Sequence, residues 1–134
     1  MKTALGLVVA LVLAAPAASA EDWGGLADAD VVRIMTVNED GSERTTKIWV
    51  VVVDGAPHVR TGATRWFANL ERDPQVVVTE GESEYVARAL RVTAADRISQ
   101  VQAAFREKYG FMDRLTGLVR IGGPRIFELV PRID

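Results

Sequence analysis

Residues 44–53, which read RTTKIWVVVV, give the strongest strand signal in the sequence. β-Branched and aromatic side chains fill this run, and both types are enriched in strands. Because successive side chains of a strand point to opposite faces, residues 44–47 are polar on both faces and residues 48–53 are apolar on both. A strand with one solvated face would alternate instead. We therefore expect the 48–53 end to be covered on one side by a barrel core and on the other by a helix or a second subunit, and we predict a homodimer on this basis.

The runs around this strand predict a small antiparallel barrel. A strand at 31–37 precedes it across the turn at 38–42, and Asp54-Gly55, a strong hairpin signal, leads to a strand at 57–61. Further strands are predicted at 75–80, 84–93 and 125–130. Helices are predicted at 64–73, with Thr64 as N-cap, and from Thr93 to the turn at Gly110, with Thr93 as N-cap in a pattern with Asp96 that resembles a capping box. The segment 111–118 is helical or irregular. The fold class is mainly β (α+β), with six antiparallel strands in a barrel and two to three helices.

The first 20 residues have the organisation of a secretory signal peptide. Lys2 gives a positive start, an apolar run follows at 4–15, and Ala18-Ser19-Ala20 suits a signal peptidase. The alternative is a retained membrane anchor, but the apolar run is shorter than the roughly 20 residues that span a bilayer. We predict export to the periplasm or the medium by the general secretory pathway, with no stable membrane anchor after cleavage. Residues 21–29 are interpreted as a leader or a short helical start, and 30–134 as one domain.

The charged and metal-binding residues exclude several classes of function. Loss of Lys2 with the signal peptide leaves 15 basic and 18 acidic side chains, a balance that argues against a nucleic-acid partner. The chain has no cysteine, which excludes disulfides, thiol chemistry and cysteine-ligated metals. His58 is the one histidine, so no metal site is predicted, and we interpret it as a surface or structural residue.

A family resemblance rests on the order of the predicted elements and on two segments. These segments are TKIWVVVVDGAPHVRTG at 46–62 and RWFANLERDPQVVV at 65–78. The chain resembles the pyridoxamine 5'-phosphate oxidase-like superfamily of FMN-binding split barrels. More narrowly, it is similar to the uncharacterised group called domain of unknown function 2255, over about residues 26 to 133. The resemblance implies a six-stranded split β-barrel at 30–134 that pairs as a homodimer. In that superfamily FMN, or a deazaflavin, or in some branches haem, lies between the two protomers.

The resemblance also implies a set of cofactor-binding residues. A phosphate dianion suits guanidinium groups, hydroxyls and a helix N-terminus. The residues at the start of the second strand and around the turn into the first helix are Arg44, Thr45, Thr46, Lys47, Arg60, Thr61, Arg65 and Trp66. The alternative interpretation is that Arg44 and Lys47 are solvated charges, and that Trp49 and Trp66 pack in the core. Haem has the least support from the residues, because His58 is the only histidine ligand on offer.

Two functions follow from this sequence. The first is a flavin-dependent oxidoreductase that acts on a small molecule, in which the cofactor carries the redox chemistry and the protein binds and orients it. No catalytic acid or base is identified. The second is a non-catalytic ligand-binding module that kept the split barrel and lost or changed the cofactor. A hydrolase lacks a nucleophile and base pair in the sequence.

Overall fold

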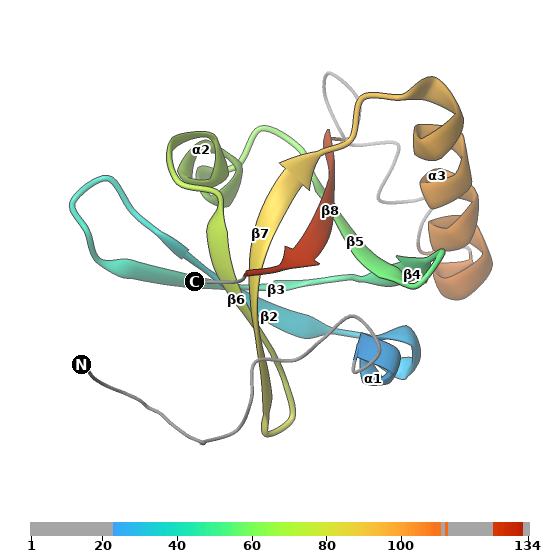
Figure 1. Cartoon of the computed structure of the whole chain (residues 1–134), viewed down its shortest axis with the longest axis horizontal. Coiled ribbons are helices and arrows are strands. Elements are labelled where there is room, and N and C mark those ends of the chain that lie inside the picture. Colours follow the sequence, from blue (N-terminus) through green and yellow to red (C-terminus); the bar gives the residue numbers. More distant parts are fainter. Residues whose placement is uncertain (1–22, 111, 113–124, 133–134) are drawn as a thin grey trace.

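The computed structural model describes residues 23–110, 112 and 125–132 (Figure 1). The predicted signal peptide at 1–20 and most of the segment at 111–118 lie outside these residues. In chain order the elements are α1 Gly24–Asp28, β2 Val32–Val37, β3 Glu43–Ile48, β4 Val51–Val53, β5 Ala56–Thr61, α2 Arg65–Arg72, β6 Gln75–Glu80, β7 Ser83–Arg91, α3 Ala95–Tyr109 and β8 Arg125–Pro131. None of the helices in the described part of the chain is long and apolar enough to cross a membrane.

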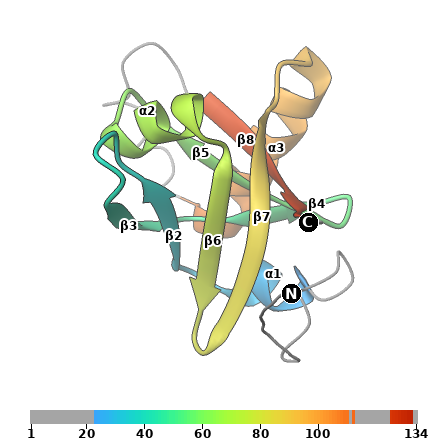
Figure 2. The same ribbon diagram turned by 60° about the vertical axis from the view of Figure 1, so that its left-hand side comes forward.

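The strands form one curled antiparallel sheet of seven strands, so the predicted number of six is wrong. Their order is β3-β2-β6-β7-β8-β5-β4, which places β3 and β4 at opposite edges. Only Trp49 and Val50 separate these two strands along the chain. The two edges of the sheet must therefore approach each other at this point, and the sheet curls into the half-barrel seen in Figures 1 and 2. This architecture, mainly β with three helices, is consistent with a split barrel.

The predicted strand at 44–53 breaks at Val50 because other groups satisfy the backbone of that residue. The N–H of Val50 donates to the Tyr109 hydroxyl at 3.0 Å, and its carbonyl accepts from Lys108 Nζ at 2.7 Å. The Tyr109 hydroxyl also lies 2.9 Å from the carbonyl oxygen of Asp30 and 3.0 Å from that of Val50. Val50 is fully buried, so its polar groups need partners inside the protein. The last turn of α3 supplies them.

The two apolar faces of the 48–53 run are covered as the pattern predicts. Ile48 and Val50 lie in the main core, inside the curled sheet. Val51 faces the other way and packs with Val101 and Phe105 of α3 in a second cluster. A helix therefore covers the outer face, which was one of the two predicted alternatives. The apolar run no longer argues for a second subunit, and the homodimer stays a prediction.

The segment at 21–29, interpreted as a leader or a short helical start, contributes to the core. Its described part, residues 23–29, contains α1, and the side chains of Trp23 and Leu26 are buried. The Trp23 ring stacks on Tyr85 of β7 with 5.3 Å between ring centroids. Residues 23–29 thus pack as part of the domain.

The predicted caps of the two longer helices differ in outcome. Thr64 caps α2 as predicted, because its hydroxyl accepts from the N–H of Phe67 at 3.2 Å. The prediction of Thr93 as the cap of α3 is wrong: the N-cap is Ala94, without a side-chain bond. The N–H of Val92 still bonds to the carbonyl of Ile126 in β8, so strand-like pairing continues up to the start of this connection.

Candidate functional site

A surface pocket of about 300 Å³ lies where the end of β3 meets β5 and the start of α2. We call it the tryptophan pocket, and its lining residues are Lys47, Ile48, Trp49, Arg60, Thr61, Gly62, Thr64 and Trp66. Four of the eight predicted cofactor-binding residues are among them, namely Lys47, Arg60, Thr61 and Trp66. The pocket therefore combines two cationic side chains with two indole rings and two hydroxyls.

Arg60 is the most firmly held cation of the tryptophan pocket. It is 8% exposed, and β5 places it under α3. Its Nη1 donates to Gln102 Oε1 at 2.5 Å, and its guanidinium carbon lies 4.0 Å from the centroid of the Phe105 ring. A cation over an aromatic face is attracted by the electrons of the ring. The positive charge is thus fixed in the wall of the pocket.

The loop between β5 and α2 is held by its own hydroxyl groups. The Oγ1 atoms of Thr61 and Thr64 are 2.7 Å apart, and the Thr61 hydroxyl donates to the carbonyl of Gly62 at 3.1 Å. The donor between the two threonines is then Thr64. Thr61 is 4% exposed, so its first role is to shape the loop at the start of α2.

The two tryptophans of the pocket are also packed against the protein. Trp66 is 6% exposed and belongs to the main core, as the alternative interpretation of this residue expects. Trp49 is half-buried and stacks on the Tyr109 ring with 4.1 Å between centroids and an interplanar angle of 3°. The Tyr109 ring thereby fixes the plane of the indole at the pocket.

The other four predicted residues do not join the tryptophan pocket. Arg44 and Arg65 line a separate surface pocket of about 480 Å³. We call it the arginine pocket, and its lining residues are Asn38, Glu39, Asp40, Arg44, Arg65, Ala68, Asn69 and Arg72. Thr45 is exposed and Thr46 half-buried on β3, and neither is among the described residues that line the two pockets.

Sequence reasoning missed the residues that complete the arginine pocket. Arg65, Ala68, Asn69 and Arg72 follow the spacing i, i+3, i+4 and i+7, which places them on one face of a helix. That spacing was a usable signal. The contribution of the turn between β2 and β3 was not visible, because it depends on how α2 packs against β2.

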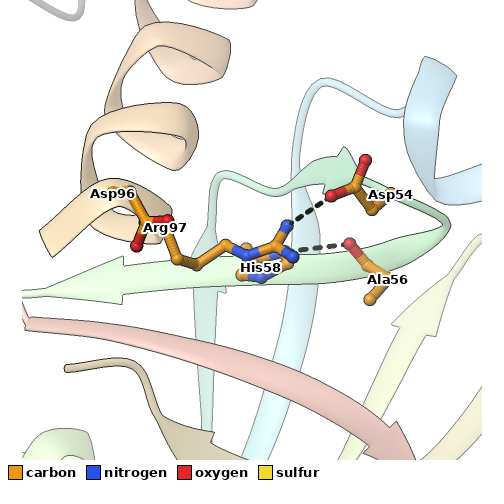
Figure 3. Close-up of polar contacts among 5 residues, drawn as sticks. All are labelled: Asp54, Ala56, His58, Asp96 and Arg97. Atoms are coloured by element: carbon orange, nitrogen blue, oxygen red, sulfur yellow. Dashed lines mark hydrogen bonds and ion pairs between the residues drawn. The ribbon is translucent and has the colours of Figure 1, made fainter. Parts of the chain in front are cut away.

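His58 is fully buried on β5. Of the two predicted roles, surface or structural, burial fits the structural one. Its Nδ1 lies 2.9 Å from the carbonyl oxygen of Ala56, and an ion pair between Arg97 and Asp54 lies nearby (Figure 3). Burial lowers the pKa of His58 below its ordinary value, although the bond to Ala56 and the charge of Glu128 act in the opposite direction. Within the described residues, no three His, Cys, Asp or Glu side chains gather where they could hold a metal ion.

Two kinds of comparison relate this chain to known proteins. The sequence profile of a family described as "Uncharacterized protein conserved in bacteria (DUF2255)" matches residues 24–121. No functionally curated protein is similar enough in sequence to match the chain.

Several solved structures have the same fold. The haem-storage protein HutZ of Vibrio cholerae superimposes with a TM-score of 0.65 at 22% identity, over 81% of this chain and 86% of HutZ. A Listeria innocua protein provisionally assigned as a pyridoxamine 5'-phosphate oxidase gives 0.62 at 12% identity, over 81% and 88%. An FAD-binding protein of Mesorhizobium loti gives 0.59 at 13% identity, over 81% and 85%. The chain spans only 50% of a similar Agrobacterium tumefaciens protein of unknown function. These likenesses confirm the split-barrel fold.

Proposed function

Because the chain belongs to the bacterial family DUF2255 and has the split-barrel fold found in flavin- and haem-binding proteins, we propose that it binds FMN in the tryptophan pocket. We further propose that it serves as a flavin-dependent oxidoreductase for a small molecule. The observation that carries the proposal is the meeting of Lys47 and Arg60 with Trp49 in one pocket. Ammonium and guanidinium groups suit a phosphate, and an indole offers a face to an aromatic ring.

The buried position of Arg60 favours a fixed anionic group in this pocket. Gln102 and the Phe105 ring hold the guanidinium, so little side-chain freedom is lost when a ligand binds. Bound FMN would supply the redox chemistry, and the side chains would bind and orient it. A deazaflavin with the same phosphate would suit the same groups.

Flavin is a better fit than haem for these residues. A haem iron is most often held by a histidine, and His58 is fully buried with its Nδ1 at the Ala56 carbonyl. No other histidine occurs in the chain. Among the described lining residues of the tryptophan pocket, none is a histidine, a cysteine or a methionine.

A second subunit would complete the site. At about 300 Å³ the tryptophan pocket lies at the lower end of the range for small-molecule sites, which is roughly 300–1,000 Å³. A second copy packed over the pocket mouth would enlarge and close it, and we therefore retain the homodimer as part of the proposal. Export through the predicted signal peptide is also part of it, and the cofactor would then be acquired outside the cytoplasm.

The alternative function is a binding module without catalysis. The described lining of the tryptophan pocket has no carboxylate and no imidazole, the groups that most often transfer protons in catalysis. A split barrel that kept the pocket and changed its ligand would look the same in this respect.

FMN titration of the purified chain tests the proposal, with flavin fluorescence as the readout. Lys47→Ala removes an exposed cation of the tryptophan pocket, and Arg44→Ala removes a cation of the same strand that lines the other pocket. We expect Lys47→Ala to weaken FMN binding at least about tenfold, because a charged hydrogen bond contributes about 1.5–3 kcal/mol, and Arg44→Ala to leave it within about twofold. Equal losses in both variants would refute the site.

FMN binding and the reduction of the bound flavin distinguish the oxidoreductase from the binding module. If the folded chain binds FMN, reduction of the bound flavin and its reoxidation by a small-molecule acceptor are the next measurements. If the folded chain shows no saturable FMN binding, the flavin proposal fails and the binding module remains.

A further inference from the structure

The arginine pocket lies on a different face of α2 from the tryptophan pocket. Trp66 lines one pocket, whereas Arg65 and Arg72 line the other. Consecutive helix positions are about 100° apart, so Arg65 and Trp66 point in different directions. The remaining wall comes from Arg44 of β3 and from the turn between β2 and β3, against which α2 packs.

A buried amide organises the arginine pocket. Asn69 is 3% exposed, and its Nδ2 donates to Thr36 Oγ1 and to Asn38 Oδ1, both at 3.0 Å. Its own Oδ1 accepts from Arg72 Nη2 at 2.8 Å. Asn38 Oδ1 accepts a second bond, from Arg44 Nε at 3.1 Å. Two arginines from different elements are therefore held in place through one connected pair of asparagines.

The partners of these arginines are neutral, and this decides the charge of the pocket. An amide oxygen orients a guanidinium group without cancelling its charge, unlike a carboxylate. Arg44 uses its Nε–H on Asn38, so its terminal amino groups can face a ligand. Arg72 also reaches the carbonyl of Val37 at 3.3 Å, another neutral acceptor. The guanidinium groups keep their capacity to bind an anion.

Two carboxylates, Glu39 and Asp40, also line the pocket, against three guanidinium groups. Asp40 is committed to its own turn, because its Oδ1 accepts from the Ser42 hydroxyl at 2.6 Å and from the Ser42 N–H at 2.9 Å. These bonds lower the pKa of Asp40. Among the described residues, no ion pair joins either carboxylate to the three arginines. The balance in the pocket stays positive.

We propose that the arginine pocket binds an oxyanion, the phosphate or carboxylate group of a small molecule, at a site separate from the flavin. Guanidinium groups from β3 and α2 converge on a cavity of about 480 Å³, enough for a small metabolite. Arginine matches both oxyanions through paired N–H donors. The site does not depend on whether FMN binds, because the two pockets share no described lining residue.

Calorimetric titration of the whole purified chain with inorganic phosphate, and separately with succinate, tests this site at low ionic strength. Arg65→Gln removes an exposed guanidinium of the pocket, and Arg44→Gln removes a second one from another element. Arg88→Gln is the matched control, since it removes the same charge from an exposed position on β7. Glu39→Gln has the opposite effect on the charge of the pocket, because it removes a negative charge.

We expect saturable binding of at least one probe, with affinity about tenfold lower in each of Arg65→Gln and Arg44→Gln. Arg88→Gln should stay within about twofold, and Glu39→Gln should tighten binding a few-fold because a nearby like charge is removed. The stronger of the two probes identifies the ligand as phosphate-bearing or carboxylate-bearing.

Three results would overturn the proposal. The first is a folded chain that binds neither probe. The second is an equal loss in Arg88→Gln, which would mean a general charge effect. The third is an equal loss in Lys47→Gln, which would place the anion in the tryptophan pocket. Thermal unfolding of each variant shows whether it is folded. Arg65→Gln should be folded, because the exposed Arg65 side chain makes no hydrogen bond to another described residue.

Discussion

Tyr109→Phe is expected to destabilise the fold by about 1–3 kcal/mol, through a single backbone amide. The variant removes the hydroxyl that accepts from the fully buried N–H of Val50, and an unsatisfied buried donor costs about that much. The other contacts of the hydroxyl add little. Val50 O keeps Lys108 Nζ at 2.7 Å, and the exposed Asp30 can bind water. The ring remains, so its stack on Trp49 is retained.

Urea unfolding measures this loss directly, and thermal unfolding should show a fall in Tm of about 4–12 °C. The chain has two tyrosines, so Tyr85→Phe is a matched control. Among the described residues the Tyr85 hydroxyl makes no hydrogen bond, and we expect this variant within about 0.5 kcal/mol of the parent. A Tyr109→Phe variant as stable as Tyr85→Phe would refute the account of the strand break.

The same hydroxyl predicts a dependence on alkaline pH. Burial raises the pKa of Tyr109 above its ordinary value of 10.0. The unfolded chain then loses this proton at lower pH than the native chain does. Stability contributed by Tyr109 is present below pH 10 and is lost as the pH rises through the native pKa. Tyr109→Phe should remove this part of the alkaline decline.

Three further predictions concern stability. Thr64→Ala should cost about 1 kcal/mol in urea unfolding, since it removes the N-cap of α2, and Thr64→Ser should restore most of it. The parent chain should lose stability as the pH falls below about 6.5, by up to about 1.4 kcal/mol per pH unit. The reason is that burial lowers the pKa of His58, so the unfolded chain takes up the proton at a higher pH than the native chain does. A His58→Gln variant whose stability follows the same pH curve would contradict this. Asn69→Leu should cost about 2–4 kcal/mol of stability, because it leaves the buried Thr36 hydroxyl without its donor. The double variant with Thr36→Val should cost less than the sum of the two single changes, because it also removes that hydroxyl. Strict additivity would speak against the hydrogen bond.

The order of elements and the two covered faces of residues 48–53 could be predicted from the sequence, because both depend on the local pattern of apolar and polar side chains and on the turn residues. The break at Val50 could not. The groups that satisfy its backbone, on Lys108 and Tyr109, lie 58 and 59 residues away in the chain. β-Branched side chains on both sides of the break give no hint of it, so the sequence suggested one strand where the structure has two.

Only half of the predicted cofactor-binding residues line the tryptophan pocket, again because contacts between distant segments decide the rest. Arg60 and Thr61 end a strand and precede a helix cap, and the pocket forms there. Arg44 and Arg65 are of the same chemical type and close in sequence to this point, but the direction of a side chain on α2 changes by about 100° per residue. Residue type therefore identified the cations, and only the packing of α2 on β2 showed that they serve two cavities.

The edges of the curled sheet bear on how this protein behaves in concentrated solution. Exposed strand edges invite pairing between molecules and aggregation, and short or charged edge strands discourage it. One edge here is β4, which has three residues, and the other is β3, where Glu43 and Lys47 are exposed. Neither is a long apolar template for another chain. Extension of the sheet from one molecule into the next is therefore disfavoured, and we expect any partner copy to associate through side-chain surfaces instead.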